Sequence, residues 1–540
     1  MNPTEPCRLL RFTLAASAGL LFAAAACLVQ AAQPSIRLGS PMPPGSAVPT
    51  MQAPLVPNTP PQQNFPPPAQ PAPPPVTLAP PATTPIPPPL NAIPAPNLPA
   101  PGQIVVPGAT MDPRPARVGE ILIFGQQITK DYVIRRQIPL QPGQILSFPD
   151  LRLAEHNLAG LGIFVVDPKT GVHPTVTADP EAPNDFKNIL VHVQEAPTTS
   201  FMFGVSVNSD TILNGSLVFN ERNFDITGWP SSFDDFRTGR AFRGAGEELR
   251  VEATPGTAEQ RYSATFREPY LLDSLFSLTA SGYYYQNAYH DQYTESRLGG
   301  RVTVARRLDP NWSVEGTVRL EDVGVHHIPF GAPPQITVDQ GDHFLAGFRA
   351  GVTYDTRDSI FRPTEGFMAN LSFEEVTGDF TFPKAILDID KFWTLGQRPD
   401  GSGRQVLALR SELGIAGSNT PVFERFYAGG FRSLRGFAFR GVGPSALGIE
   451  VGGDFEFLNR LEYQAPLLAN DHLYGVAFFD TGTVESSVEL RNYRIAAGAG
   501  LRIQVPQLGP LPLALDFGFP IVKANGDHTQ LFSFWIGFIH

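Results

Sequence analysis

Residues 494–505 have the sequence RIAAGAGLRIQV, which alternates two kinds of side chain along its whole length. Every second residue is apolar, namely Ile495, Ala497, Ala499, Leu501, Ile503 and Val505. The residues between them are small or polar and include Arg494 and Arg502. Because successive side chains of an extended chain point to opposite faces, this period of two predicts a β-strand with one apolar and one polar face.

The same alternation recurs throughout residues 198–540. It is clearest in GDFEFLNRLEYQ (453–464), NWSVEGTVRLE (311–321) and HFLAGFRAGVTYD (343–355). No stretch in this region reaches the roughly 18 consecutive apolar residues that predict a transmembrane helix. Two architectures use such strands. A soluble sandwich buries the apolar face against a second sheet, and a transmembrane barrel turns it to lipid.

Three features favour the barrel. Arginine recurs beside glycine on the polar face, aromatic residues gather in GYYYQNAY (282–289), and the chain ends on the alternating segment FSFWIGFIH (532–540). At roughly 20 residues per strand with its connection, residues 198–540 hold about 16 strands, an even number as is usual in bacterial barrels. We therefore predict an all-β membrane fold, an antiparallel transmembrane β-barrel that is almost wholly strand.

The first 31 residues have the pattern of a secretory signal peptide. Two arginines precede an apolar stretch, residues 12–29, and small residues allow cleavage after Ala31. Two alternatives stay open, a membrane anchor formed by the same stretch and lipoprotein processing at Cys27. Because the other cysteine, Cys7, also lies in this signal, the mature chain offers no thiol for a disulfide or a metal site.

Proline is concentrated in residues 32–115, which include PNTPPQQNFPPPAQPAPPPVTLAPPATTPIPPPL. Proline has no amide donor and favours the extended polyproline II conformation, so this segment predicts a disordered, semi-rigid linker instead of a folded domain. A tether that spans a gap and a passive extension are both compatible with this composition.

Residues 116–197 have the composition of a small globular domain. RVGEILIFG (117–125) predicts a strand, and TKDYVIRRQI (129–138) predicts a helix capped by Thr129. A second helix is expected over SFPDLRLAEHNLAGLG (147–162), followed by strands at IFVVD (163–167) and NILVHVQEA (188–196). The predicted order is strand, helix, helix, strand, strand, and this domain is expected to hold all ordered helices of the mature chain.

Together these segments resemble the BamA-type outer-membrane assembly family, also called the bacterial surface antigen family. The segment VIRRQIPLQPGQILSFPDLRLAEHNLAGLGIF (133–164) is similar to that family's POTRA domain. In the barrel region the similar motifs are EPYLLDSLFSLTASGYYY, VTYDTRDSIFRPTEGF, FFDTGTV and LALDFGFP. The resemblance covers residues 116–540. It implies one α+β POTRA domain in the periplasm (116–197) and a barrel in the bacterial outer membrane (198–540).

The segment GGFRSLRGF (429–437) resembles the family's Arg-Gly-Phe motif in a long loop that folds back into the barrel lumen. The resemblance implies that Arg435, Gly436 and Phe437 form this loop contact and that Asp480 and Asp516 are the acidic partners of Arg435. A desolvated arginine needs such carboxylates. From the residues alone, an exposed and solvated Arg/Gly loop stays open as the alternative.

The resemblance also implies a function, which is assisting the folding and insertion of β-barrel proteins into the outer membrane. Unfolded clients would pair with a POTRA sheet edge and with a lateral seam between the first and last barrel strands. The seam residues are Phe201, Phe203, Val205, Phe532, Phe534, Ile536 and Phe538. Expected partners are the unfolded clients, accessory envelope lipoproteins and the lipid bilayer. The assembly proteins usually carry several POTRA domains, so a two-partner-type secretion pore is the alternative, and a tethered binding module is a third class.

Other classes of function lack support in the sequence. The formal charge is −11 with no dense Lys/Arg run, which excludes a typical nucleic-acid binder. The sequence has no G-x-S-x-G, H-E-x-x-H or phosphate-loop motif, so we expect no enzyme and no cofactor. His326 and His327 project to opposite sides of a strand, so no metal site is expected there.

Overall fold

The computed structural model describes residues 115–182, 185–210, 212–289, 292–360, 362–504 and 513–536. The predicted signal peptide, almost all of the proline-rich segment and Phe538 lie outside these described residues.

A small α+β domain comes first. Its elements are β1 (Arg117–Phe124), α2 (Asp131–Arg135), α3 (Phe148–Gly160), β2 (Thr175–Ala178) and β3 (Phe186–His192). The sheet order is β1-β3-β2, in which β1 runs parallel and β2 antiparallel to the central strand. Val133, Leu151 and Leu158 from the two helices are buried against Ile189 and Val191 of β3, which gives the domain its own core. The predicted element order is confirmed.

Two details of this domain differ from the prediction. The N-cap of α2 is Lys130 and not Thr129, whose hydroxyl instead accepts a hydrogen bond from Asn223 Nδ2 at 3.0 Å. The segment IFVVD is not a strand, because it makes only isolated bridges at Phe164 and Asp167, and the second strand is β2. Its apolar character reflects burial of an irregular segment in the core, a case that an apolar run alone cannot distinguish from a strand.

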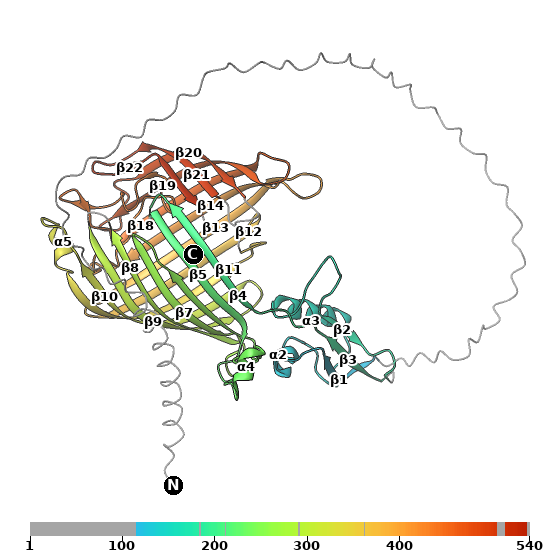
Figure 1. Ribbon diagram of the computed structural model, residues 1–540. Coiled ribbons are helices and arrows are strands. Elements are labelled where there is room, and N and C mark those ends of the chain that lie inside the picture. The colour runs from blue at the N-terminus through green and yellow to red at the C-terminus, as the bar shows by residue number, and fades with distance from the viewer. Residues whose placement is uncertain are drawn as a thin grey trace, which may run out of the picture. The chain divides into compact units, whose positions relative to one another are not determined.

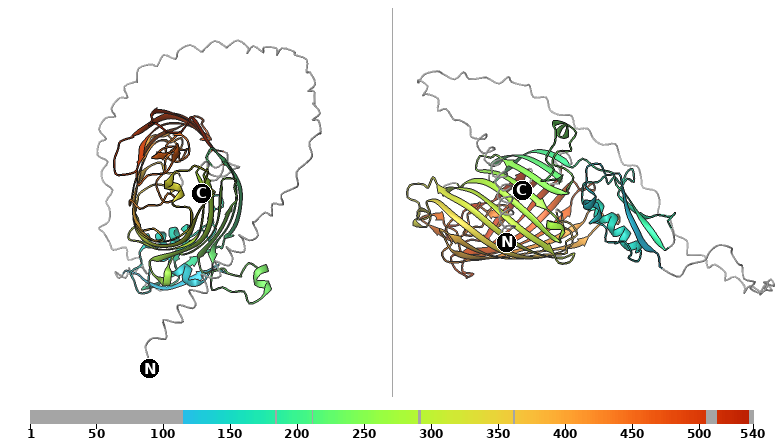
Figure 2. Two further views of the ribbon diagram at one scale, coloured as in Figure 1. Left: turned by 90° about the vertical axis from the view of Figure 1, so that its left-hand side faces the viewer. Right: turned by 90° about the horizontal axis from the view of Figure 1, so that it is seen from below.

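Residues 199–536 form a closed antiparallel barrel of sixteen strands (Figures 1 and 2). The strands are β4 (Thr199–Asn208), β5 (Ile212–Phe224), β6 (Glu247–Thr254), β7 (Glu259–Glu268), β8 (Phe276–Tyr289), β9 (Tyr293–Arg307), β10 (Trp312–His326), β11 (Gly341–Asp355), β12 (Gly366–Gly378), β13 (Phe382–Gly396), β14 (Gln405–Ala416), β18 (Phe455–Pro466), β19 (Leu473–Glu485), β20 (Arg494–Ile503), β21 (Leu513–Val522) and β23 (Phe532–Ile536). The chain enters β4 from the small domain, so the β5–β6 and β7–β8 connections lie at that end of the barrel. The β14–β18 connection lies at the other end.

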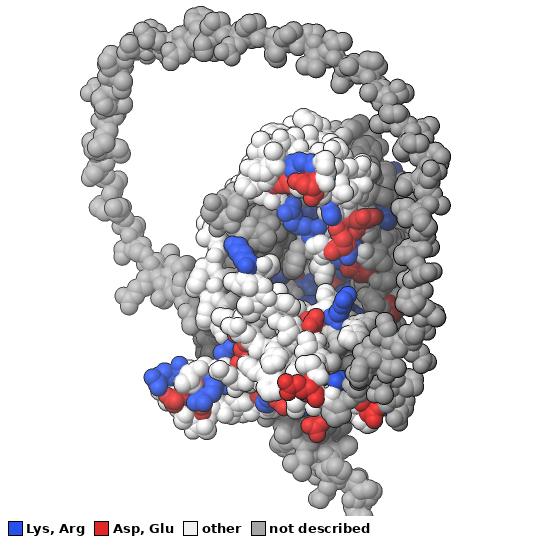
Figure 3. All heavy atoms as spheres, turned by 90° about the vertical axis from the view of Figure 1, so that its right-hand side faces the viewer, with Lys and Arg blue, Asp and Glu red and all other residues white. Residues whose placement is uncertain are grey.

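The alternating faces are where the sequence pattern predicts them. On β10, Val318 and Leu320 are exposed on the outside, whereas Glu321 is buried inside. Phe348 on β11 and Phe373 on β12 are likewise more than half exposed. Large apolar side chains therefore cover the outer surface, which faces lipid, and ionic side chains line the interior, which Figure 3 shows as blue and red groups within the hollow.

The barrel region contains short helices, so the expectation that every ordered helix lies in residues 116–197 was wrong. They are α4 (Phe233–Arg237), η1 (Leu271–Asp273) and α5 (Pro334–Thr337), and each lies in a connection between strands. Local chemistry explains them, since Ser232 and Asp235 form a capping box for α4 and proline begins α5. Among the described residues, no helix combines the length and hydropathy needed to cross a bilayer.

Candidate functional site

The long β14–β18 connection, residues 417–454, is folded inward among the barrel strands. It contains the short strands β15 (Gly436–Phe437), β16 (Ser445–Ala446) and β17 (Ile449–Glu450). Several of its side chains are almost fully buried, namely Val422, Phe423, Leu434, Phe437 and Val442. Strand β15 pairs with β22 (Thr529–Gln530), which precedes the last barrel strand. We refer to residues 417–454 as the inner loop.

Arg435 of the inner loop binds Asp480 on β19. Its Nε donates to Asp480 Oδ2 at 2.8 Å and its Nη2 donates to Oδ1 at 2.9 Å, a bidentate arrangement. The Arg435 backbone amide also donates to Asp480 Oδ2, at 3.1 Å. Arg435 is 4% exposed and Asp480 is fully buried, so this ion pair is shielded from water.

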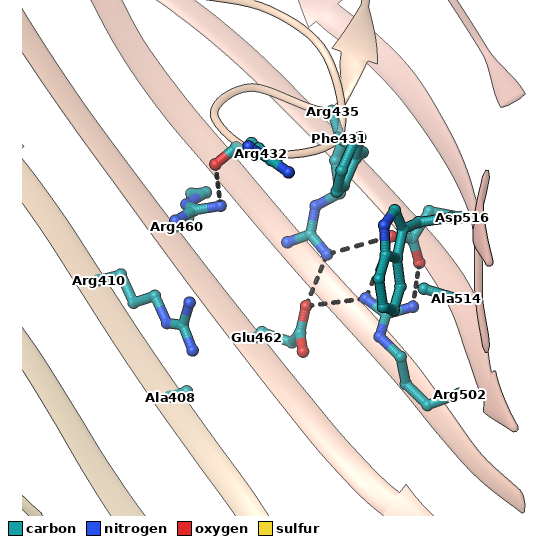
Figure 4. A pocket seen from close by; sticks show the side chains of 11 residues that line it. Ala408, Arg410, Phe431, Arg432, Arg435, Arg460, Glu462, Arg502, Ala514 and Asp516 are labelled. Carbon is teal, nitrogen blue, oxygen red and sulfur yellow. Dashed lines mark hydrogen bonds and ion pairs between the residues drawn. The ribbon is translucent and has the colours of Figure 1, made fainter. Parts of the chain in front are cut away.

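Further acidic and basic groups surround Arg435 (Figure 4). Arg435 Nη1 donates to Glu462 Oε2 at 2.6 Å, and it lies 3.6 Å from Asp516 Oδ2. Asp516 is bound more closely by Arg502, whose Nη1 donates to Asp516 Oδ1 at 2.6 Å. The structure thus brings both predicted aspartates to Arg435, Asp480 as the direct partner and Asp516 as the more distant one.

Two groups in contact with Arg435, Glu462 and Phe478, were not predicted from the sequence. Glu462 lies on the polar face of the segment 453–464, but nothing in the pattern singles it out among the other polar residues. Phe478 places its ring 3.6 Å from the guanidinium carbon of Arg435, a cation–π contact. Phe478 precedes Asp480 by two positions, so both side chains fall on the same face of β19.

Gly436 and Gly518 allow the inner loop to touch the barrel wall. Gly436 has a φ of +92°, in the left-handed region that favours glycine. A Cβ on Gly518 would lie 2.6 Å from the Gly436 nitrogen and 2.9 Å from the Arg435 carbonyl carbon. Backbone approaches backbone here, so neither position has space for a side chain without movement. The adjacent Phe437 is 1% exposed and packs in an apolar cluster that includes Leu458.

The inner loop has a second ionic contact, in which the loop supplies the acid and the barrel strands supply the cations. Glu424 accepts from Arg297 Nη1 at 2.7 Å and from Arg319 Nη1 at 3.1 Å, and it lies 3.6 Å from Lys384 Nζ. These cations come from β9, β10 and β13. Arg297 also donates to the carbonyl of Phe423, at 2.7 Å. Glu424 was not predicted as part of the site, because its partners Arg297, Arg319 and Lys384 lie far from it along the chain.

Arg440 of the inner loop makes a third contact, with aromatic rings. Its guanidinium carbon lies 3.6 Å from the ring centre of Tyr289 and 3.5 Å from that of Tyr427. Its Nη1 donates to Gln292 Oε1 at 3.0 Å. No motif in the sequence predicted this arrangement.

A cavity of about 450 Å³ adjoins the Arg435 cluster (Figure 4). Basic residues dominate its lining and include Arg410 and Arg460, which face each other across the β14–β18 ladder. Arg460 donates to the backbone carbonyl of Arg432 in the inner loop. Trp535 of the last strand also lines the cavity.

The first and last barrel strands, β4 and β23, meet and close the barrel. Within the described residues, β4 meets β23 through two pairs, Asn208 with Trp535 and Val207 with Ile536. Counted over the same described residues, the other barrel ladders contain from four residue pairs, between β21 and β23, to fourteen, between β10 and β11, and the description of β23 ends at Ile536. The predicted seam residues in the described chain are exposed or half-buried: Phe201, Phe203, Val205, Phe532, Phe534 and Ile536.

The small domain bonds to the barrel at the turn after β5. Lys130 Nζ lies 2.6 Å from Asp225 Oδ2, and the Lys130 amide donates to the carbonyl of Gly244 at 2.9 Å. Burial alone would raise the pKa of Asp225, but hydrogen bonds from Lys130 and Thr227 outweigh it, so the pKa is lowered. Arg136 stacks over Tyr270, with its guanidinium carbon 4.3 Å from the ring centre.

A lipid-facing sixteen-stranded barrel preceded by a βααββ domain defines a class, the outer-membrane β-barrel proteins with a periplasmic POTRA domain. Two family models match the chain in agreement with this class. The model of the Omp85 superfamily domain matches residues 241–539. The POTRA model, described as surface antigen variable number repeat, matches residues 116–196. The chain belongs to the Omp85 superfamily. Its barrel lies in the outer membrane and its POTRA domain in the periplasm.

Relatives with names include the outer membrane protein assembly factor BamA of Nitratidesulfovibrio vulgaris, 26% identical over 434 residues, 78% of this chain and 51% of that protein. BamA of Neorickettsia risticii is 24% identical, with 78% of this chain and 54% of that protein covered. The sorting and assembly machinery component 50 homolog of Bos taurus is 24% identical over 42% of this chain and 48% of that protein. The chain spans about half the length of these relatives.

Solved structures share the fold. The crystal structure of BamA from Haemophilus ducreyi lacking POTRA domains 1-3 has a TM-score of 0.62 and 20% identity, and the match covers 78% of this chain and 84% of that one. CdiB from Acinetobacter baumannii has a TM-score of 0.53 and 14% identity, covering 78% and 74%. At these identities the likeness shows a common architecture and does not distinguish one activity from another.

Proposed function

We propose that this chain is an outer-membrane protein assembly factor, which assists the folding and insertion of β-barrel proteins without covalent chemistry. The names of its relatives support this proposal, because the chain matches two BamA proteins over 78% of its length. The single observation that carries it is that the barrel closes where its first strand, β4, meets its last, β23.

The proposed mechanism uses β4 as a template. Lipid cannot satisfy unpaired amides and carbonyls, so an open edge in the hydrocarbon region is unfavourable until a strand pairs with it. Among the described residues, two pairs join β4 to β23, which is described only as far as Ile536, and ten pairs join β4 to β5. Separation of β4 from β23 leaves the ladder between β4 and β5 intact, and an unfolded client strand can pair with the exposed edge of β4 by β-augmentation.

The inner loop supports the template in this proposal. The loop–lumen contact holds β15 of the inner loop beside β22, which directly precedes the last barrel strand β23. This contact consists of Arg435, Gly436, Phe437, Asp480 and Asp516. With the loop fixed at Arg435, Glu424 and Arg440, the rest of the barrel keeps its shape while the seam opens. Clients are expected to meet an edge strand of the POTRA sheet first, which is β1 or β2, because an edge strand presents unpaired backbone groups. Accessory envelope lipoproteins are the further partners proposed.

A reversible cross-link across the seam tests the proposal. Val207→Cys with Ile536→Cys places thiols on paired residues, and the mature chain has no cysteine if cleavage follows Ala31. The oxidised pair should stop client insertion into vesicles, and reduction should restore it. The matched control is Val302→Cys with Val318→Cys, an equivalent pair on β9 and β10 away from the seam. Undiminished insertion by the oxidised seam pair would refute the proposal.

Depletion of the protein in cells distinguishes the alternative. An assembly factor should reduce many outer-membrane barrel proteins together, as measured by proteomics of isolated outer membranes. Loss of one exported protein from the medium, with barrel proteins unchanged, would identify a secretion pore instead.

A further inference from the structure

The β5–β6 connection is a structured excursion that exposes large aromatic side chains. It comprises residues 225–246 and carries α4 at its tip. Trp229, Phe233 and Phe236 are 66%, 83% and 55% exposed. In Figure 1 it lies at the end of the barrel where β5 and β6 meet, and both views of Figure 2 show this green segment projecting sideways past the barrel wall.

The excursion is held in one conformation by its own hydrogen bonds. Asp235 Oδ2 accepts from the amides of Ser231 and Ser232 at 2.9 and 3.0 Å, which caps α4. Asp225 Oδ1 accepts from the amide and the hydroxyl of Thr227, at 3.0 and 2.7 Å. The exposure of the aromatic residues is therefore a property of an ordered segment.

The exposed aromatic residues share one face. Phe233 and Phe236 are three positions apart on α4, and such residues are neighbours on a helix surface. Trp229 and Phe236 both pack against Phe242, with ring centres 5.2 and 6.2 Å away. Phe242 in turn stacks on Phe224 of β5 at 6.1 Å, so the aromatic face is joined to the barrel wall.

This face continues the lipid-facing surface of the barrel. On the neighbouring β4, Phe201 and Phe203 are 65% and 72% exposed. The next connection at the same end of the barrel, between β7 and β8, exposes Leu272 and Leu275. Large aromatic groups on an ordered segment of this kind mark an interaction surface. Tryptophan in particular concentrates at the level of lipid headgroups.

We propose that the excursion seats its aromatic face in the phospholipid leaflet on the periplasmic side of the outer membrane. The position fits, because the chain enters β4 from the periplasmic domain at this end of the barrel. The net charge of the excursion also indicates which type of lipid headgroup it contacts. Within residues 225–246, Asp225, Asp234 and Asp235 balance three arginines, so the net charge is zero. A segment of zero net charge gains no general attraction to an anionic surface, so the headgroup is zwitterionic and the seat depends on the aromatic side chains.

Insertion of the excursion into the leaflet also restrains the POTRA domain, which binds the base of the excursion. Asp225 and Gly244 at the base of the excursion both bind Lys130 of the POTRA domain. A membrane-seated excursion therefore ties the POTRA domain to the bilayer surface next to β4 and β5.

A spin label at one position measures the seat directly. Phe233→Cys is introduced into the mature chain, which has no other thiol if cleavage follows Ala31, and the protein is reconstituted in phosphatidylcholine vesicles. The matched controls are Phe348→Cys on the lipid-facing side of β11 and Leu447→Cys, which is 76% exposed in the inner loop region. Collision rates with oxygen, which enriches in lipid, and with a nickel chelate, which stays in water, report the depth of each label.

The expected result is that the Phe233 label resembles Phe348 in its ratio of oxygen to nickel collisions, shifted toward the headgroup level. A ratio equal to that of Leu447 would place Phe233 in water and overturn the proposal. Protection from both reagents would indicate a protein partner, which also overturns it. Addition of phosphatidylglycerol should leave the ratio unchanged, and a seat that appears only with this anionic lipid would refute the zwitterionic assignment.

Discussion

Arg435→Ala is the sharpest test of the loop–lumen contact. The substitution removes the Nε, Nη1 and Nη2 donors, and with them the bonds to Asp480 and Glu462. Asp480 is fully buried, so it is left as a carboxylate without its cation. Breaking a buried ion pair from one side destabilises by about 3–5 kcal/mol.

The lower end of that range is expected here. Arg502 already bonds to Glu462 and Asp516, so those two carboxylates keep a cation, and the Arg435 amide still donates to Asp480. Only Asp480 loses its ionic partner, together with the Phe478 ring contact. The predicted loss is therefore about 3 kcal/mol in the free energy that holds the inner loop in place.

Limited proteolysis measures this loss. The segment 432–440 should be cut faster in Arg435→Ala than in the parent, while the barrel still resists heat in gel-shift assays. Arg435→Lys should rescue only in part, because lysine keeps the charge but lacks the planar fork that makes the bidentate bond. The double variant with Asp480→Ala should be destabilised by less than the two single variants added together, with a coupling of about 2 kcal/mol or more. Strict additivity, with unchanged proteolysis, would refute the contact.

Two further predictions concern backbone approach and pH. Gly518→Ala should displace the inner loop and destabilise it by about 1–3 kcal/mol, because the new methyl group meets the Gly436 backbone. The control is Gly316→Ala, because nothing lies within 4 Å of a Cβ at that position. Equal protease sensitivity of the inner loop in the two variants would contradict the steric argument. The pKa of Asp225 is lowered in the folded chain, so the Lys130–Asp225 contact contributes stability at neutral pH and loses it as the pH falls below about 4. Asp225→Asn should remove this acid-dependent release of the POTRA domain, measured by amide exchange near Lys130, and an unchanged acid response would count against it.

The sequence determined the periodic features of this protein. The period of two in segments such as 311–321 placed Leu320 outside and Glu321 inside, because side-chain direction in a strand depends only on position. The order of elements in the POTRA domain followed from helix-spaced and strand-like runs in the same way. The one wrong strand, at 163–167, failed because burial of Phe164 produces the same apolar signal as a strand.

Resemblance to a family supplied Arg435 and its aspartates, and no periodicity could have done so. The contacts of Glu462, Glu424 and Arg440 appeared only in the structure, because each joins the inner loop to strands far away in the chain. The alternation alone fits either a barrel in lipid or a sandwich with a second sheet, and the sequence predicted the barrel from the arginine and glycine on the polar face, the aromatic cluster at 282–289 and the alternating last segment. The meeting of β4 with β23 confirms that the barrel is closed. Local chain geometry sets which way a side chain points, and only the register of all sixteen strands sets what it meets there.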